Sequence, residues 1–171
     1  MEHADIDIRP FAPGEWALYK AIRLKALEND PLVFGSSFAE EKTLPDEKWQ
    51  QDLVNPDGAV FGVFRNGNLI GMTGIAVDRS DPAKQTAKLW GSWLEPEWRA
   101  KGLSRKMYEK RLAWAKAHPT VKRVIVSHRK TNAVSKRANQ RHGFRFTHAA
   151  ERVWHGGHKD TEFFYELVVK P

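Results

Sequence analysis

Hydrophobic residues along the chain follow two different spacings, and each spacing predicts its own kind of element. Apolar residues that recur every three or four positions predict helices, over residues 13–29, 45–54, 101–117 and 132–142. Short runs rich in Val, Ile, Phe and Trp between turn residues predict strands, over residues 6–10, 59–64, 69–77, 86–94, 121–127, 144–149 and 161–169. Residues 32–41 fit neither spacing, and Gly35-Ser36-Ser37 reads as a loop.

The predicted elements follow the order β-α-α-β-β-β-α-β-α-β-β. Asn66-Gly67 is a strong hairpin signal, which favours antiparallel neighbours. The strand-helix-strand segment over residues 89–127 instead predicts one parallel crossover. We therefore expect a mixed α/β (α+β) fold with a mostly antiparallel sheet. The length of 171 residues fits a single domain spanning residues 1–171.

Composition excludes several classes of protein. Hydrophobic residues make up 41% of the chain, with 7 Trp, 3 Tyr and 9 Phe, which is too apolar for a disordered chain. The chain has no cysteine, which excludes disulfides, thiolate nucleophiles and cysteine metal sites. His148, His155 and His158 fit a polar hairpin better than a metal site, so no metal is expected. Without a signal peptide or a long apolar run, we expect a cytoplasmic protein with no membrane partner.

Positive charge is concentrated in one segment. The chain carries a formal net charge of +7, yet residues 99–141 hold 14 Lys or Arg and a single acid, Glu109. The rest of the chain is therefore acidic on balance. A basic segment on an acidic body indicates an anionic partner at one face. The candidates are a phosphate-bearing cofactor, a nucleic acid or an acidic membrane.

The start of the basic segment has the features of a phosphate site. A strand is predicted to end at Leu94, a turn follows, and a helix begins at once. Unpaired N–H groups and the positive dipole end make a helix start attractive to anions. Gly102 lets a phosphate approach the backbone, Arg99 and Lys101 add positive charge, and Ser104 adds a hydroxyl donor.

This segment resembles a signature of a known family. Arg99-x-x-Gly102-x-Ser104 is similar to the pyrophosphate loop of the GNAT acetyltransferase superfamily, and Leu94-x-Pro96-x-x-Arg99 is similar to the strand exit before it. Ser104 stands where that family usually carries Gly or Ala. The predicted element order also resembles the GNAT order along essentially the whole chain.

A second GNAT-like signature follows downstream. Asn132-x-x-Ser135, followed by Gly143-Phe144, resembles the family pattern at the expected separation from the first. Asn139 departs from it, because many GNAT enzymes carry at this position a tyrosine that protonates the leaving thiolate. An asparagine can donate a hydrogen bond but cannot act as that acid.

The resemblance implies a fold and a cofactor. Two splayed parallel central strands, the strand ending at Leu94 and the strand over residues 121–127, would hold acetyl-CoA between them. Backbone groups near Trp93 and Leu94 would pair with the pantetheine arm and polarise the acetyl carbonyl. Trp90 and Trp93 point to opposite faces of a regular strand, so one is expected in the core and the other at the acceptor cleft. A bulge in the strand would change that parity. The implied cofactor-binding residues are Trp93, Leu94, Arg99, Ala100, Lys101, Gly102, Leu103, Ser104 and Asn132.

The implied activity is acetyl transfer to an amine. The resemblance predicts direct attack of a primary amine, on a small molecule or a protein, on acetyl-CoA within a ternary complex. Glu41 is the candidate base that removes the amine proton, and Asn139 occupies the leaving-group position. Ser37 and Glu40 are candidate substrate-binding residues in the loop that borders the acceptor site. The resemblance also allows a homodimer formed through the last two strands.

Two other functions remain open at this point. One is a GNAT-fold module that binds CoA without efficient turnover, which Asn139 favours. The other is a nucleic-acid binder that uses the basic segment from Arg99 to Arg141. Tyr108 and Trp114 are the aromatics near those basic side chains, which leaves no evident stacking platform and makes nucleic acid the weaker candidate.

Overall fold

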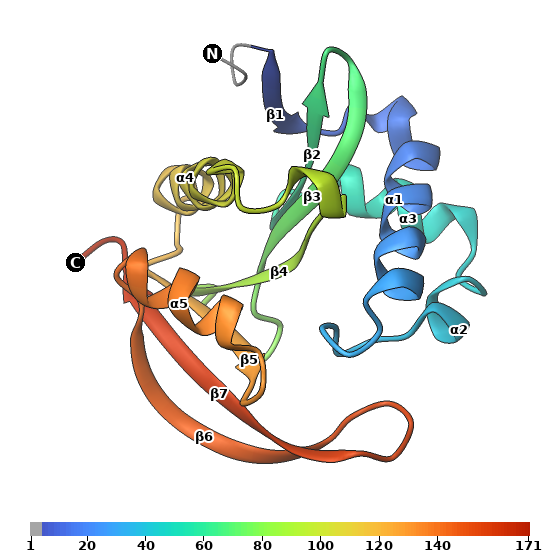
Figure 1. The fold of residues 1–171 in the computed structure, drawn as a ribbon. Coiled ribbons are helices and arrows are strands. Elements are labelled where there is room, and N and C mark those ends of the chain that lie inside the picture. The colour runs from blue at the N-terminus through green and yellow to red at the C-terminus, as the bar shows by residue number, and fades with distance from the viewer. Residues whose placement is uncertain (1–4) are drawn as a thin grey trace.

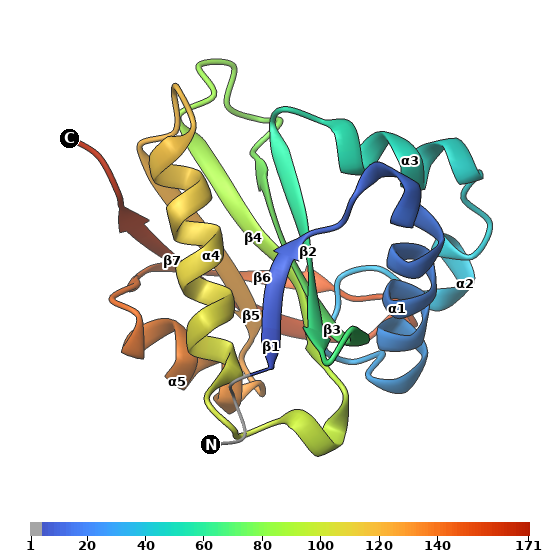
Figure 2. The same ribbon diagram turned by 90° about the horizontal axis from the view of Figure 1, so that it is seen from above.

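The computed structural model describes residues 5–171, which build one seven-stranded sheet with helices on both faces, as Figure 1 and Figure 2 show. The strands are β1 (Ile6–Pro10), β2 (Gly58–Arg65), β3 (Asn68–Val77), β4 (Thr86–Leu94), β5 (Arg123–Arg129), β6 (Arg145–Val153) and β7 (Lys159–Val168). The helices are α1 (Trp16–Asn29), α2 (Phe38–Glu41), α3 (Asp46–Val54), α4 (Leu103–Ala117) and α5 (Ala133–Arg141), with 3-10 turns η1 (Pro13–Glu15) and η2 (Pro96–Trp98). The strand order is β1-β2-β3-β4-β5-β7-β6, which confirms the expected mixed, mostly antiparallel fold.

Strands β4 and β5 form the parallel pair. They are paired only over Thr86–Lys88 and Arg123–Ile125, at the start of each strand. Beyond Lys88 the two strands run apart, as Figure 1 shows. The splayed central strands inferred from the sequence are therefore present. The separation leaves backbone groups in the second half of β4 without a strand partner on that side.

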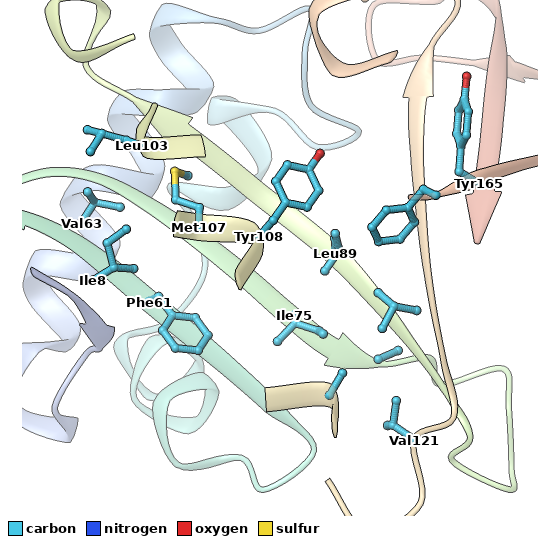
Figure 3. Close-up of a cluster of buried hydrophobic side chains, with 14 of the residues drawn as sticks. Ile8, Phe61, Val63, Ile75, Leu89, Leu103, Met107, Tyr108, Val121 and Tyr165 are labelled. Carbon is cyan, nitrogen blue, oxygen red and sulfur yellow. The ribbon is translucent and has the colours of Figure 1, made fainter. Parts of the chain in front are cut away.

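Each face of the sheet carries its own apolar core. Helix α4 covers one face, and its Leu103, Met107 and Tyr108 belong to one buried cluster with Ile75 and Leu89 of the sheet (Figure 3). Helices α1 and α3 cover the other face, as Figure 2 shows. Buried aromatic and aliphatic side chains dominate this second core: Phe11, Tyr19, Ile22, Ala26, Leu27, Phe34, Trp49, Val60, Phe64, Met72 and Trp93. The sheet therefore separates two sides of the molecule, and each side has its own buried core between the sheet and its helices.

Several element boundaries differ from the sequence expectation. Helix α4 begins at Leu103 rather than at residue 101, because the positive φ of 81° at Gly102 is incompatible with a helical turn. A short helix, α2, lies in the segment left unassigned. Ser37 caps it by accepting a hydrogen bond from the Glu40 N–H, and the Glu40 side chain reaches back to the Ser37 backbone. Ser-x-x-Glu is a capping-box pattern that the sequence displays.

A bulge in β4 changes the parity that a regular strand would give the two tryptophans. The β3–β4 register shifts between Met72 and Gly74, and Gly91 adopts a φ of 68°. An extra residue in one strand reverses the alternation of faces beyond it. Trp93 is therefore buried in the α1–α3 core, and Trp90 packs against that same core instead of facing the opposite side.

Candidate functional site

The loop between β4 and α4, residues 99–104, presents its backbone to open space. Ala100 and Gly102 adopt positive φ angles of 58° and 81°, and a Cβ placed on Gly102 would meet no neighbouring atom within 4 Å. Gly102 is the N-cap of α4, so the N–H groups that follow have no acceptor within the helix. Buried Leu103 anchors the loop to the core. The exposed side chains beside this backbone are those of Arg99, Lys101 and Ser104.

Arg99 ties this loop to the segment after α1. Its Nε donates to the Leu94 carbonyl at 2.9 Å, and its Nη2 donates to Asp30 Oδ2 at 2.7 Å. Trp93 Nε1 donates to the same oxygen at 2.6 Å. Partial burial raises the pKa of Asp30, but the hydrogen bonds from Trp93 and Arg99 outweigh it and lower the pKa overall. The side chain of Trp93 is thus occupied with Asp30.

The second signature lies at the start of α5. Asn132 is the N-cap of this helix, and its Oδ1 accepts a hydrogen bond from the Ser135 N–H at 3.1 Å. The cap uses the amide oxygen, which leaves the amide N–H groups of Asn132 for another partner. The start of α5 follows directly after β5, so Asn132 lies beyond the strand that diverges from β4.

Asn139 is buried and has a tyrosine as its partner. The residue is 1% exposed, and its Oδ1 accepts a hydrogen bond from the Tyr108 hydroxyl at 2.5 Å. Its Nδ2 has no hydrogen-bond partner among the residues that the structure describes. Burial raises the pKa of Tyr108 against the opposing charge of Arg111, so the hydroxyl stays protonated at neutral pH. The Tyr108 hydroxyl, which comes from α4, therefore lies beside residue 139, where this chain carries asparagine instead of the expected tyrosine.

The two candidate acceptor residues Ser37 and Glu40 serve the local backbone. Their side chains form the capping box of α2, and Glu40 Oε2 also accepts from the Ser36 hydroxyl at 3.3 Å. Glu40 is exposed, so one face of its carboxylate remains open to solvent. Ser37 is engaged in positioning the helix that carries Glu41.

Glu41 forms a double hydrogen bond with an arginine of α1. Arg23 Nε donates to Oε2 at 2.9 Å, and Arg23 Nη2 donates to Oε1 at 2.8 Å. The guanidinium lies 5.1 Å from the ring centroid of Phe34 and 5.5 Å from that of Trp90. The side chains of Arg23 and Glu41 are only 9% and 16% exposed. Such a planar two-point pair fixes both groups in orientation.

Glu41 and Arg23 line a cavity that we call the α1–α3 cavity. Its volume is about 670 Å³, and its walls come from α1, α2, α3 and strands β2 to β4. The lining includes the side chains of Tyr19, Arg23, Glu40, Glu41, Trp49 and Trp90. Because α1 to α3 lie on the sheet face opposite α4 (Figure 2), the α1–α3 cavity and the base of α4 are on different sides of the sheet.

Three contacts of the site were not predicted from the sequence: Arg23 with Glu41, Asp30 with Arg99, and Tyr108 with Asn139. Arg23 lies four residues after Tyr19 and four before Leu27, on the apolar face of α1. A charged residue at such a position signals a buried ion pair, but the partner in α2 could not be read from spacing. Tyr108 occupies a core-facing position of α4, where an apolar residue would pack equally well.

Two features are absent from the described part of the chain. No group of three or more His, Cys, Asp or Glu side chains within residues 5–171 is placed to hold a metal ion. Across those same residues, no helix is both long and apolar enough to cross a membrane.

Comparisons with known proteins identify the family. The model of the acetyltransferase (GNAT) family matches residues 22–144, which is more than half of the chain. A sequence comparison with curated proteins finds no match. The matched region contains the 99–104 loop, the splayed strands and α5.

Solved structures show the same fold. A GNAT-family acetyltransferase from Streptococcus pneumoniae has a TM-score of 0.80 at 20% identity, covering 95% of this chain and 98% of that one. The yncA protein of Salmonella typhimurium, solved with its cofactor acetyl-CoA, has a TM-score of 0.79 at 19% identity and covers 97% of this chain and 95% of that one. An N-acetyltransferase from Staphylococcus aureus has a TM-score of 0.78 at 20% identity, covering 98% and 100%. The chain belongs to the acetyltransferase (GNAT) family, whose co-substrate is acetyl-CoA.

Proposed function

We propose that this chain is an N-acetyltransferase that moves the acetyl group of acetyl-CoA to a primary amine by direct attack in a ternary complex. The observation that carries the proposal is the position of two candidate sites on opposite faces of the sheet. The 99–104 loop offers open backbone N–H groups at the start of α4, and the α1–α3 cavity lies on the opposite face. The splayed strands β4 and β5 join the two.

The 99–104 loop fits a pyrophosphate group. Open space at Gly102 and positive φ angles at Ala100 and Gly102 leave N–H groups exposed to an anion, with Lys101 and Ser104 beside them. We propose that Leu103 holds this backbone in place from the core. The backbone of Trp93 and Leu94 would pair with the pantetheine arm along the open edge of β4, and the Asn132 amide would donate to it from α5.

The chemistry requires one bond to form and one to break. Acetyl-CoA supplies an activated acyl group, and the neutral amine nitrogen bonds to its carbonyl carbon while the carbon–sulfur bond breaks. We propose that Glu41 accepts the proton that the amine loses, directly or through water. A backbone N–H near Trp93 would stabilise the carbonyl oxygen as negative charge develops on it. Ser37 and Glu40 would border the incoming amine.

The leaving sulfur needs a hydrogen-bond donor. We propose that the unpaired Nδ2 of Asn139 donates to it, with the Tyr108 hydroxyl holding the amide in that orientation. This arrangement offers a donor where the family often has a tyrosine. It argues against reading Asn139 alone as a sign of lost activity.

The proposal is tested by binding and turnover together. Acetyl-CoA is titrated into the protein by calorimetry, and release of free thiol is then followed with a panel of primary amines. We expect saturable binding and thiol release that depends on the amine. Absence of acetyl-CoA binding would overturn the proposal and return the basic segment to nucleic acid or another anion.

A further inference from the structure

The α1–α3 cavity has a distinct electrostatic character. Six carboxylates line it, Glu40, Glu41, Asp52, Asp57, Asp78 and Asp81, against four bases, Arg23, Lys48, Arg79 and Lys84. This acidic balance contrasts with the net charge of +7 for the whole chain. An excess of one charge sign in a cleft attracts ligands of the opposite sign. The excess of two carboxylates over bases in this lining therefore favours a positively charged ligand over an anion.

The pKa values of three carboxylates of this cavity, Asp57, Asp78 and Asp81, lie below their usual range. Hydrogen bonds from Lys84 and His118 lower the pKa of Asp57. Asp52 accepts a hydrogen bond from the Tyr19 hydroxyl at 2.9 Å and also contacts Lys48. Each acid already has a local donor, so a ligand is attracted by the summed field rather than by one free carboxylate.

Two buried N–H donors of the cavity lining lack an acceptor. Arg23 Nη1 and Trp49 Nε1 have no hydrogen-bond partner among residues 5–171. Both residues are buried, with exposed fractions of 7% for Arg23 and 1% for Trp49. Unpaired buried donors are costly, and most buried polar groups in folded proteins are paired. A ligand that brings an oxygen acceptor to them would remove that cost.

The unpaired Nη1 of Arg23 lies close to β4, the strand whose end leads toward the 99–104 loop. A Cβ on Gly91 would be 3.6 Å from Arg23 Nη1, which places this nitrogen beside the β4 bulge. Glu41 already neutralises Arg23 through two hydrogen bonds. A carboxylate brought to Nη1 would therefore add a net negative charge to a buried site. A neutral carbonyl oxygen satisfies the same N–H without that charge.

We propose that the α1–α3 cavity binds an amine acceptor that carries an uncharged carbonyl oxygen next to the amine and no negative charge. Amino-acid amides and the first residue of a peptide share this chemistry. The ammonium form is drawn in by the acidic lining, and the carbonyl accepts from Arg23 Nη1. The apolar walls, which include Trp49 and Trp90, take the side chain. This inference rests on the proposed function and specifies its acceptor.

The test compares three ligands that differ in one group. Phenylalaninamide carries the amine and a neutral carbonyl, phenethylamine lacks the carbonyl, and phenylalanine carries a carboxylate instead. Binding of each to the protein saturated with CoA is measured by calorimetry, and thiol release is measured with acetyl-CoA. We expect the amide to bind about tenfold more tightly than the amine, as one hydrogen bond allows. Phenylalanine should bind more weakly than both.

Arg23→Lys isolates the hydrogen bond. Lysine keeps a positive charge for Glu41 but lacks a second nitrogen that could donate to the ligand. The variant should therefore bind the amide and the amine with about equal affinity. Arg65→Lys is the matched control. Arg65 also has a buried, unpaired nitrogen and an aromatic contact, with Trp98, but it lies outside the cavity lining. That variant should keep the wild-type preference.

The outcomes separate this inference from the proposed function. Equal binding of amide and amine, or tighter binding of phenylalanine, would overturn the inference even if thiol is released. The binding ranking decides the inference even if no compound supports turnover, which would count against the proposed function alone. A tripeptide amide that starts with phenylalanine distinguishes the two sources. Tighter binding than phenylalaninamide points to a peptide, and weaker binding points to a small amide.

Discussion

The two proposed binding sites, one on each face of the sheet, are built from different parts of the chain. On the α4 face, the 99–104 loop offers backbone N–H groups around Gly102, and open space surrounds that residue. On the other face, the α1–α3 cavity is built from side chains held by ion pairs, such as Arg23 with Glu41. A backbone site suits a co-substrate shared by a whole family, because side chains can change around it. A side-chain site can vary from member to member and can therefore set the acceptor.

The largest expected effect comes from filling the space at Gly102. Gly102→Val places a β-branched residue at a φ of 81° and projects its side chain toward the proposed pyrophosphate position. We expect acetyl-CoA affinity to fall by about 100-fold, as loss of two charge-assisted hydrogen bonds allows. Calorimetry with acetyl-CoA measures it.

Gly67→Val is the control for that variant. Gly67 has a φ of 79° and equally open surroundings, but it lies in the β2–β3 turn. Both variants should lose a similar amount of stability, and only Gly102→Val should lose acetyl-CoA. Equal affinity in the two variants would remove the 99–104 loop from the binding site.

Changes on the acceptor face should alter turnover more than co-substrate binding. Glu41→Gln removes the proposed base, and kcat/KM for an amine should fall by about 100-fold. Glu47→Gln, at an exposed acid of α3 that lies outside the cavity lining, should change kcat/KM by less than about threefold. Similar losses in both variants would contradict the role of Glu41.

A smaller effect is expected at the leaving-group side. Tyr108→Phe removes the hydroxyl that holds Asn139, and kcat should fall by about tenfold with acetyl-CoA affinity nearly unchanged. Tyr165→Phe is a comparison variant, because the Tyr165 hydroxyl contacts His128 Nε2 at 3.1 Å instead. An unchanged kcat in Tyr108→Phe would show that the Tyr108–Asn139 pair is purely structural.

The smallest effect concerns the contact that joins the two regions. Asp30→Asn removes a negative charge from Arg99, so acetyl-CoA should bind about two- to threefold more tightly. Because the folded pKa of Asp30 is lowered, its ionised form contributes stability above its usual pKa and loses it as pH falls through the lowered value. Asp30→Asn should therefore flatten the acid limb of stability against pH, measured by denaturant unfolding. Weaker acetyl-CoA binding would contradict this account of Arg99.

The sequence predicted the α4 face more completely than the cavity, for a physical reason. The strand end, the glycine and the helix start of the 99–104 loop are contiguous, so a local pattern describes them. The positive φ at Ala100 escaped prediction because alanine rarely adopts it. A regular strand would place Trp90 and Trp93 on opposite faces, and the sequence alone does not locate the bulge that brings both to the same core.

The cavity depends on contacts between distant segments. Arg23 and Glu41 are 18 residues apart, and Trp49 meets Tyr19 from a different helix at 5.1 Å between ring centroids. Periodicity shows that these positions face inward, but it does not show which of them meet. Glu41 was selected because it lies near the expected acceptor loop, and the structure adds the arginine that orients it.

The central claim is that the two faces act together in one acetyl transfer. The most direct test is mass spectrometry of an amine incubated with acetyl-CoA and the wild-type protein, with free thiol followed in the same sample. We expect an N-acetylated amine formed in step with free CoA, and much slower formation of both products with Gly102→Val. Acetyl-CoA binding without product from any amine, with thiol release no faster than in buffer, would contradict the claim and favour a module that only binds the cofactor.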